Sequence, residues 1–363
     1  MNILKNKTKK NIKGKFLAML TAISMTAGLT ANAFADSGEV VTLGANLNAS
    51  QKQAILNYFG VDEANSNIIY VNNQQERKYL GGIAPEAQIG RVTMSSSYVV
   101  PTTSGGINVK TSNITWVTSS MIASTLATAG VENANVVAAA PFPVSGTGAL
   151  TGITIAFEKS SGEKLTEEKK KLANKELITT GNLAESVGKD KAAGIVNDTK
   201  KEVIKNDLDS EKEIKDTVKK VADNYNVTLN TGDINIITNL MKDVGNQNYN
   251  YNDIKDTLNN VSANVKNNLS QAGEKIEASG IIDKASSWIK NNKDASNFFN
   301  KFDDSKLSKD AVVSTTSTGL DEAKKVAGDL ADKAQKSGLL DRIIDFINRS
   351  EERRVGKECS EPC

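Results

Sequence analysis

Histidine is absent from the whole 363-residue chain. It is the usual general base near neutral pH and the commonest metal ligand in proteins. Its absence excludes Ser-His-Asp and Cys-His catalysis, and it excludes every zinc site that needs imidazole. Any enzymatic activity would therefore have to depend on carboxylates, lysine, tyrosine or serine.

Cysteine is nearly absent as well, because the chain has only Cys359 and Cys363. Both lie in residues 349–363, and residues 349–359 resemble the in-frame translation of a sequencing-adapter oligonucleotide. We therefore set residues 349–363 aside as an expected artefact, with native residues after about 348 missing; a genuine charged tail is the alternative. Without these two cysteines the chain has no disulfide, thiolate nucleophile or cysteine metal site.

Aromatic residues and net charge are also low, at 5% aromatic and a formal charge of +2. A nearly neutral chain gives no reason to expect nucleic acid or an acidic membrane as a partner. The scarcity of aromatic rings argues against stacking on single-stranded nucleic acid. We predict no nucleic-acid partner, no cofactor and no metal.

Residues 1–35 have the three parts of an export signal. A lysine-rich start without acids precedes the uncharged residues 16–29, and Ala33-Phe34-Ala35 offers a small-residue cleavage site before Asp36. The apolar stretch is shorter than the roughly 20 residues of a spanning helix, although an uncleaved anchor is the alternative. We expect a secreted or cell-surface protein without a membrane span in the mature chain.

The composition changes near Glu163 and predicts two domains, with a boundary at about residues 158–165. Residues 36–162 contain few charges and predict a mixed α/β domain. Residues 163–348 are rich in Lys, Glu, Asp and Asn at helical spacing, which predicts a helical bundle or an elongated helical region.

In the first part, strands are expected at residues 40–43, 68–71, 91–100, 107–117 and 136–139. Asn48 with Gln51 predicts a capping box for a helix that ends at Gly60. Further helices are expected at residues 74–80, from Ser119 or Ser120 to 129, and at 148–157. Residues 101–106 are typical of a hairpin connection between two of the strands.

In the second part, Thr166 is expected to cap a helix, and apolar stripes follow at helical spacing. Core packing is the expected role of each stripe; a partner-binding face is the alternative. The stripes are Ile236, Ile237, Leu240, Met241 and Val244; Ile254, Leu258, Val261, Val265 and Leu269; Ile281, Ile282, Ala285, Trp288 and Ile289; and Leu320, Ala323, Val326, Ala327, Leu330, Ala331 and Ala334.

The candidate binding residues are Ser145, Gly146, Thr147 and Gly148, which follow a strand and precede a helix. Such glycines allow a phosphate to approach backbone N–H groups at a helix N-terminus. A structural turn, an anion or glycan-phosphate site and a nucleotide site are all compatible with the motif. Trp116 is added as a possible stacking residue, with core packing as the alternative.

Catalytic motifs are weak. Ser161-x-x-Lys164 and Ser287-x-x-Lys290 have the Ser-x-x-Lys spacing of penicillin-recognising enzymes, and residues 110–112 resemble their Lys-Thr-Gly element. The order along the chain is wrong, however, and no Ser-Asp-Asn occurs. We predict no catalytic residues from these matches.

Several runs together resemble a known family: residues 75–82, 113–118, 136–146 and 176–181. They are similar to the YpuA-like family of exported Gram-positive proteins, a domain of unknown function numbered 1002. The resemblance implies export, and it implies no established activity and no catalytic residues.

The predicted function is a non-enzymatic binding module of the envelope or the extracellular space. A cell-wall polymer or an envelope protein is the expected partner. The alternative is a histidine-independent serine, lysine or carboxylate hydrolase of wall polymers or peptides, centred on residues 145–152. A secreted folding helper is a third hypothesis.

Overall fold

The computed structural model describes residues 38–274 and 293–316. The predicted signal (residues 1–35), the suspect tail (349–363) and the stripes that begin at Ile281 and Leu320 lie outside the described residues.

One mixed sheet lies at the centre of the fold, with the strand order β2-β1-β3-β5-β4-β6. Strands β1 and β2 are parallel, as are β4 and β5, whereas β3 and β6 run antiparallel to their neighbours. This arrangement confirms the mixed α/β class predicted for the first part. The strands are β1 Val40–Gly44, β2 Ile68–Val71, β3 Ser96–Pro101, β4 Ile107–Ile114, β5 Ala134–Val144 and β6 Val313–Thr315.

The predicted hairpin between β3 and β4 is wrong, because β5 lies between these two strands. Val136 to Ala139 in β5 have no solvent exposure. A strand that is apolar on both faces is most stable in the middle of a sheet. Residues 101–106 therefore pass around the start of β5, and the backbone N–H of Thr102 donates to Asn133 O at 3.2 Å.

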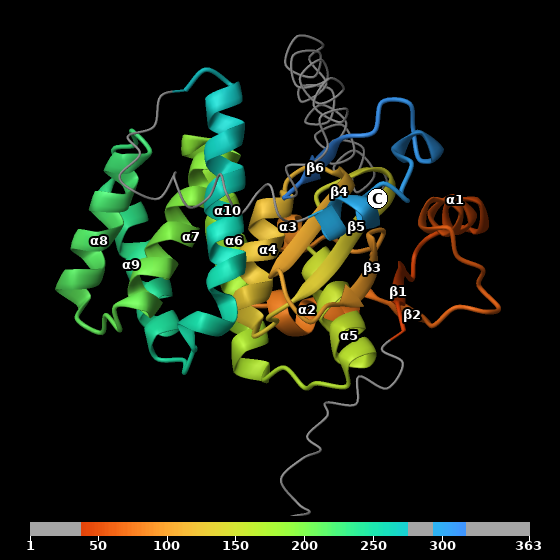
Figure 1. The fold of residues 1–363 in the computed structure, drawn as a ribbon, viewed down its shortest axis with the longest axis horizontal. Coiled ribbons are helices and arrows are strands. Elements are labelled where there is room, and N and C mark those ends of the chain that lie inside the picture. The colour runs from red at the N-terminus through yellow and green to blue at the C-terminus, as the bar shows by residue number, and fades with distance from the viewer. Residues whose placement is uncertain (1–37, 275–292, 317–363) are drawn as a thin grey trace, which may run out of the picture. The chain divides into compact units, whose positions relative to one another are not determined.

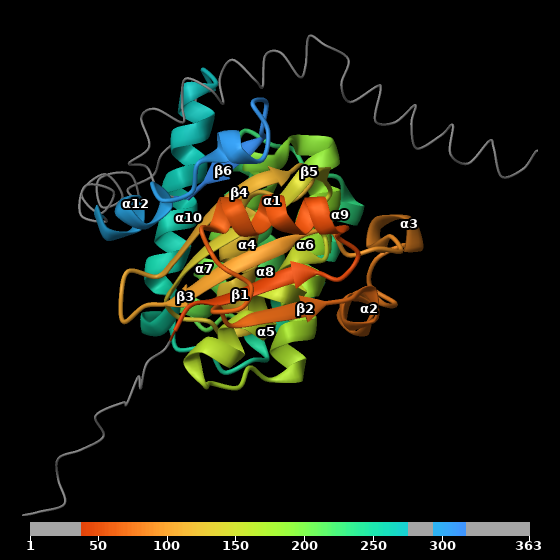
Figure 2. The same ribbon diagram turned by 90° about the vertical axis from the view of Figure 1, so that its right-hand side faces the viewer.

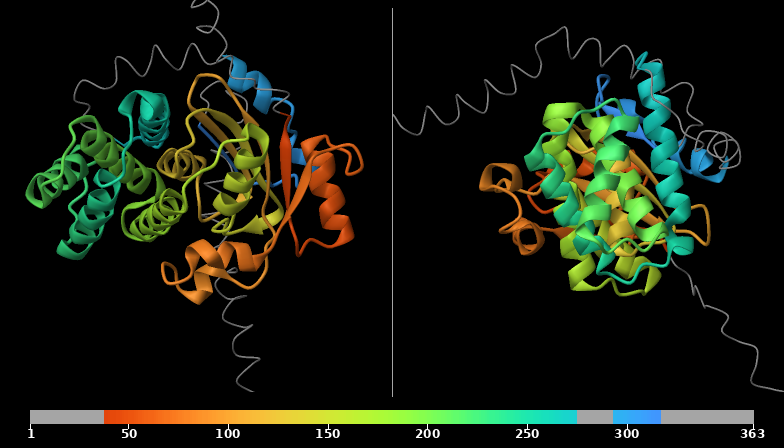
Figure 3. Two further views of the ribbon diagram at one scale, coloured as in Figure 1. Left: turned by 90° about the horizontal axis from the view of Figure 1, so that it is seen from below. Right: turned by 90° about the vertical axis from the view of Figure 1, so that its left-hand side faces the viewer.

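The two faces of the sheet bury different cores. Val136 and Ala138 belong to a large core with helices α4 and α5, while Val137 and Ala139 face α1 on the other side. This alternation follows from the two-residue period of a strand. Figure 2 shows α1 lying across the sheet, and Figure 3 shows helices, sheet and α1 as successive layers.

The large core continues without interruption from the sheet into helices α6 to α10, which stack away from it (Figure 1). The predicted boundary at residues 158–165 falls near the link between α5 and α6, and the division into two domains stays a prediction. The helices are α1 Ala49–Phe59, α2 Asn73–Leu80, α3 Glu86–Ile89, α4 Ser119–Ala129, α5 Ala149–Ser161, α6 Glu167–Val187, α7 Lys189–Lys205, α8 Glu211–Asn224, α9 Thr231–Gly245 and α10 Tyr251–Gln271.

Helix caps test the local predictions directly. Asn48 and Gln51 form the expected capping box, and the Thr166 side chain accepts a hydrogen bond from Lys169 N. For α4 the predicted cap at Ser119 or Ser120 is wrong, because Thr118 accepts from Met121 N. The two serines instead lie in the first turn of α4, where they bind distant segments: Ser119 bonds Ser314, and Ser120 accepts from Asn264.

Residues 293–316 return to the sheet, which the sequence analysis did not anticipate. We call this segment the C-terminal strap; it contains α12 Lys293–Phe299, the 3-10 turn η1 Asp304–Lys306 and β6. Its strand pairs with β4, with Thr111 opposite Ser314. The strap is drawn in blue near α1 in Figure 2.

A fully buried ion pair joins the sheet layer to the helical layers. Lys200 of α7 lies 2.8 Å from Glu176 of α6, and both side chains are at most 1% exposed. Ser124 and Thr128 of α4 donate to the two oxygens of Glu176, and the Ser124 carbonyl oxygen accepts from Lys200 at 2.6 Å. Burial lowers the pKa of Lys200, and the charge of Glu176 opposes that shift.

Replacing one partner of this pair leaves a buried charge without compensation. We therefore expect Glu176→Gln and Lys200→Met each to lower the free energy of unfolding by about 3–5 kcal/mol in urea denaturation. The double variant should lose less than the sum of the single losses, because the two changes are coupled.

The matched control is Lys212→Met, which removes the exposed pair Lys212–Asp216 on α8. An exposed pair of this kind should give no resolvable change. Equal losses for the Lys200 and Lys212 variants would contradict the structural role of the buried pair.

Candidate functional site

The carboxyl ends of the parallel strands β4 and β5 bring two predicted residues together. Trp116 follows β4 rather than lying within it, and its backbone N–H donates to Ser145 O at 3.1 Å. Thr115 N also donates to Val144 O at 2.8 Å, so the two loops lie side by side. In α/β sheets, ligands commonly bind beyond the carboxyl ends of the strands.

The glycine loop between β5 and α5 is closely packed rather than open. Gly146 has a φ of 84°, and a Cβ there would overlap the side chain of Ile114. A Cβ at Gly148 would overlap the carboxylate of Glu76. Both glycines are therefore needed for close approach within the chain itself.

Glu76 of α2 places a carboxylate beside the N-terminus of α5. The Glu76 side chain is buried, and Asn73 Nδ2 donates to its Oε2 at 3.1 Å. Helix α5 starts at Gly148 without a side-chain cap, and a helix N-terminus favours negative charge. Glu76 thus lies where a bound phosphate would be expected.

Burial raises the pKa of Glu76, and the hydrogen bond from Asn73 opposes that shift. Sequence reasoning missed this residue. One signal could have revealed it: Glu76, Tyr79 and Leu80 share the i, i+3, i+4 spacing of a buried helix face, and all three are buried.

The hydroxyl groups of Ser145 and Thr147 form hydrogen bonds within the loop and to α3. Ser145 is exposed, and its Oγ lies 3.4 Å from Thr147 Oγ1. Thr147 is buried and donates to Gln88 O at 2.9 Å, which ties the loop to α3. Within the part of the chain that the structure describes, no lysine or carboxylate is hydrogen bonded to Ser145.

Trp116 supports the interior of the fold. A Cβ at Gly181 of α6 would overlap its indole ring, so the two segments are in close contact. The ring also packs on a small core of Leu80, Ile89 and Ile178. These contacts explain why Trp116 is half-buried, and the explanation requires no ligand.

A hollow of about 360 Å³ lies next to this region, between the loop after α2 and helices α6 and α9. We call it the α6–α9 hollow. Gln88 precedes Ile89 of the small core. Its Nε2 donates at 2.8 Å to Asn182, which lines the hollow. The lining residues are Gly82, Ile83, Lys175, Ile178, Thr179, Asn182, Leu183, Asp233, Ile236 and Ile237.

The hollow combines an apolar floor with charged groups at its rim. Ile178 and Ile237 are buried in the floor, whereas Ile236 is 53% exposed. Lys175 forms an ion pair with Asp243, and Asp233 lies on α9. The predicted residues 145–148 and Trp116 lie near this hollow but do not line it.

Among residues 38–274 and 293–316, no group of three or more Asp, Glu, His or Cys side chains is arranged to hold a metal ion. No described helix is both long and apolar enough to cross a bilayer.

Comparisons with known proteins agree with one another. The family model described as a protein of unknown function (DUF1002) matches residues 43–261. The uncharacterized protein YpuA of Bacillus subtilis is 36% identical over 278 residues, which cover 75% of this chain and 94% of YpuA. No solved structure matches the chain.

The raised pKa of Glu76 gives a pH-dependent prediction. Its carboxyl binds a proton more tightly in the folded state than in the unfolded state, where the pKa is near 4.5. Stability therefore falls as the pH rises from about 4.5 through the folded-state value. Glu76→Gln should be more stable than wild type at neutral pH in urea denaturation, with no advantage below pH 4.5.

Glu167→Gln is the control of opposite sign. Hydrogen bonds from Lys170 and Lys78 lower the pKa of Glu167 to about 2. Its stabilising contribution is present above the unfolded value and is lost as the pH falls towards 2, so this variant should be less stable at neutral pH. Losses at neutral pH for both variants would contradict the placement of Glu76.

Proposed function

The chain belongs to the DUF1002 family of proteins of unknown function, and we propose that it is a non-enzymatic binding module exported to the cell envelope. Export is supported by residues 1–35, with a basic start, a short apolar stretch and Ala33-Phe34-Ala35 before Asp36.

One observation carries the binding proposal. The most deeply buried lysine and glutamate of the described residues, Lys200 and Glu176, are paired with each other, whereas the α6–α9 hollow offers an accessible apolar surface. Lys200 and Glu176 have no solvent access that a substrate could use. Ligand sites typically combine apolar walls with a few polar groups, as this hollow does.

The lining of the hollow favours a protein partner over a cell-wall polymer. Among the described residues, this lining contains aliphatic side chains and no aromatic ring on which a sugar could stack. Lys175 and Asp233 provide charges of both signs at the rim. An aliphatic side chain of an envelope protein, flanked by polar groups, would match this surface.

The test of this partner surface is a charge placed at its most exposed apolar position. Ile236→Asp should lower the amount of partner captured by cross-linking from envelope extract by about tenfold, because it puts a carboxylate where an apolar contact forms. Val92→Asp is the matched control, since Val92 is 55% exposed, like Ile236 at 53%, and does not line the hollow. Equal capture by both variants would contradict the proposed surface.

The rival hydrolase is tested with labelled peptidoglycan and labelled envelope peptides. The binding module should release no product above background. Turnover that disappears in Ser145→Ala but survives in Ser161→Ala would overturn the non-enzymatic proposal in favour of the serine site.

A further inference from the structure

The C-terminal strap inserts a carboxylate into the other face of the sheet. Asp304 Oδ2 lies 2.9 Å from Lys110 Nζ. Tyr58 OH donates to Asp304 Oδ1 at 2.9 Å, and Ser112 Oγ donates to the same oxygen at 2.5 Å. The carboxylate thus receives a cation and two hydroxyl donors at once.

These three groups are buried in α1 and β4. Tyr58 and Ser112 have no exposure, and Lys110 is 3% exposed. Asp304 is the only acidic partner that pairs with Lys110 among the described residues. A buried ammonium group needs such a partner, so the pocket would be costly to leave empty.

Aromatic rings surround the carboxylate. Phe302 of the strap lies 5.8 Å from the ring of Tyr58 and 5.3 Å from that of Tyr98, measured between ring centres. Phe302 O also accepts a hydrogen bond from Lys110 at 2.8 Å. The strap therefore places a phenylalanine and an acid, two residues apart, on this face.

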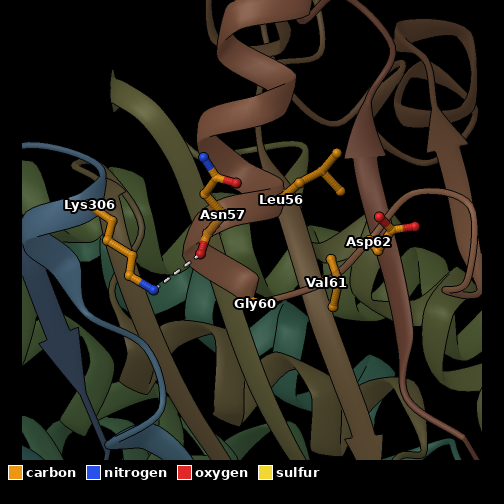
Figure 4. A pocket seen from close by; sticks show the side chains of 6 residues that line it. All are labelled: Leu56, Asn57, Gly60, Val61, Asp62 and Lys306. Atoms are coloured by element: carbon orange, nitrogen blue, oxygen red, sulfur yellow. Dashed lines mark hydrogen bonds between the residues drawn. The ribbon is translucent and has the colours of Figure 1, made fainter.

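The strap packs against α1 through Phe302 and the Tyr58–Asp304 hydrogen bond, and a hollow remains beside these contacts. A hollow of about 620 Å³ lies at the seam between α1 and the strap. Its lining includes Asn57 and Gly60 at the end of α1 and Lys306 from the strap (Figure 4). Figure 4 shows a 3.4 Å hydrogen bond from Lys306 Nζ to Asn57 O beside this hollow. It adds to the Tyr58–Asp304 hydrogen bond between α1 and the strap.

Tyr58, Lys110 and Ser112 lie within residues 43–261, which the family model matches, and Asp304 lies after them.

We propose that Tyr58, Lys110 and Ser112 form a receptor for a peptide carboxylate, with Asp304 as its tethered ligand. An acidic partner peptide with phenylalanine two residues before the carboxylate binds the same face when the strap lifts. This site lies on the opposite face of the sheet from the α6–α9 hollow, so the inference stands independently of the proposed function.

The test uses the full chain and a labelled synthetic peptide of residues 293–316. Asp304→Asn weakens the hold of the tethered strap, so this variant should bind the peptide about 30-fold more tightly than wild type in fluorescence anisotropy. Asp303→Asn is the matched control, because Asp303 Oδ1 accepts from the backbone N and the Oγ of Ser305 and asparagine keeps that oxygen, so this variant should keep wild-type affinity. A peptide that itself carries Asp304→Asn should bind the Asp304→Asn chain no more tightly than it binds the wild-type chain.

A second measurement needs no variant of the chain. In hydrogen exchange of wild type, excess peptide should accelerate exchange of the strap amides in β6 while β5 is unchanged. The Asp304→Asn peptide should have no such effect. The proposal is overturned if neither peptide accelerates exchange in β6, or if Asp304→Asn and Asp303→Asn chains bind the peptide equally.

Discussion

A buried charge must find an opposite charge or hydrogen bonds inside the protein, and this constraint organises the molecule. The pair of Lys200 and Glu176 is its clearest case, because it ties α6 and α7 to α4 on the sheet. Lys110 with Asp304 applies the same rule on the opposite face, where it ties the strap to the strand β4. The layers are joined by these polar contacts as well as by the apolar core.

The same constraint explains why familiar ligand positions are already filled. At the N-terminus of α5, where many α/β proteins bind phosphate, the carboxylate of Glu76 lies against Gly148. Among the described residues, Asp304 is the only acidic side chain that forms an ion pair with Lys110. The chain provides its own carboxylates at both places.

Local features of the fold were predictable from the sequence. The capping box at Asn48, the cap at Thr166 and the apolar stripe from Ile254 to Leu269 depend on neighbours three or four residues away. The strand order was not predictable in the same way, because the place of β5 between β3 and β4 depends on burial of both its faces. The strap was missed for a related reason: β6 has three residues, and its partners are about 200 residues away in the chain.

In the candidate site, too, the sequence predicts the local features but not the contacts with distant residues. The sequence located the glycine loop and placed Trp116 among the candidates, and the structure brings Trp116 and Ser145 together. It could not identify what fills the loop, since Glu76 comes from a helix that precedes the loop by about 70 residues. Spacing in the chain identified the glycines, whereas only tertiary packing shows that Glu76 lies against Gly148.

We infer that the Glu76 carboxylate closes the glycine loop to outside anions. Amide nitrogen–proton spectra of Gly146 and Gly148, recorded during titration with inorganic phosphate, measure this closure. Neither resonance should move in wild type. Saturable movement of both glycine resonances, with Glu76 intact, would show that the loop is open to anions.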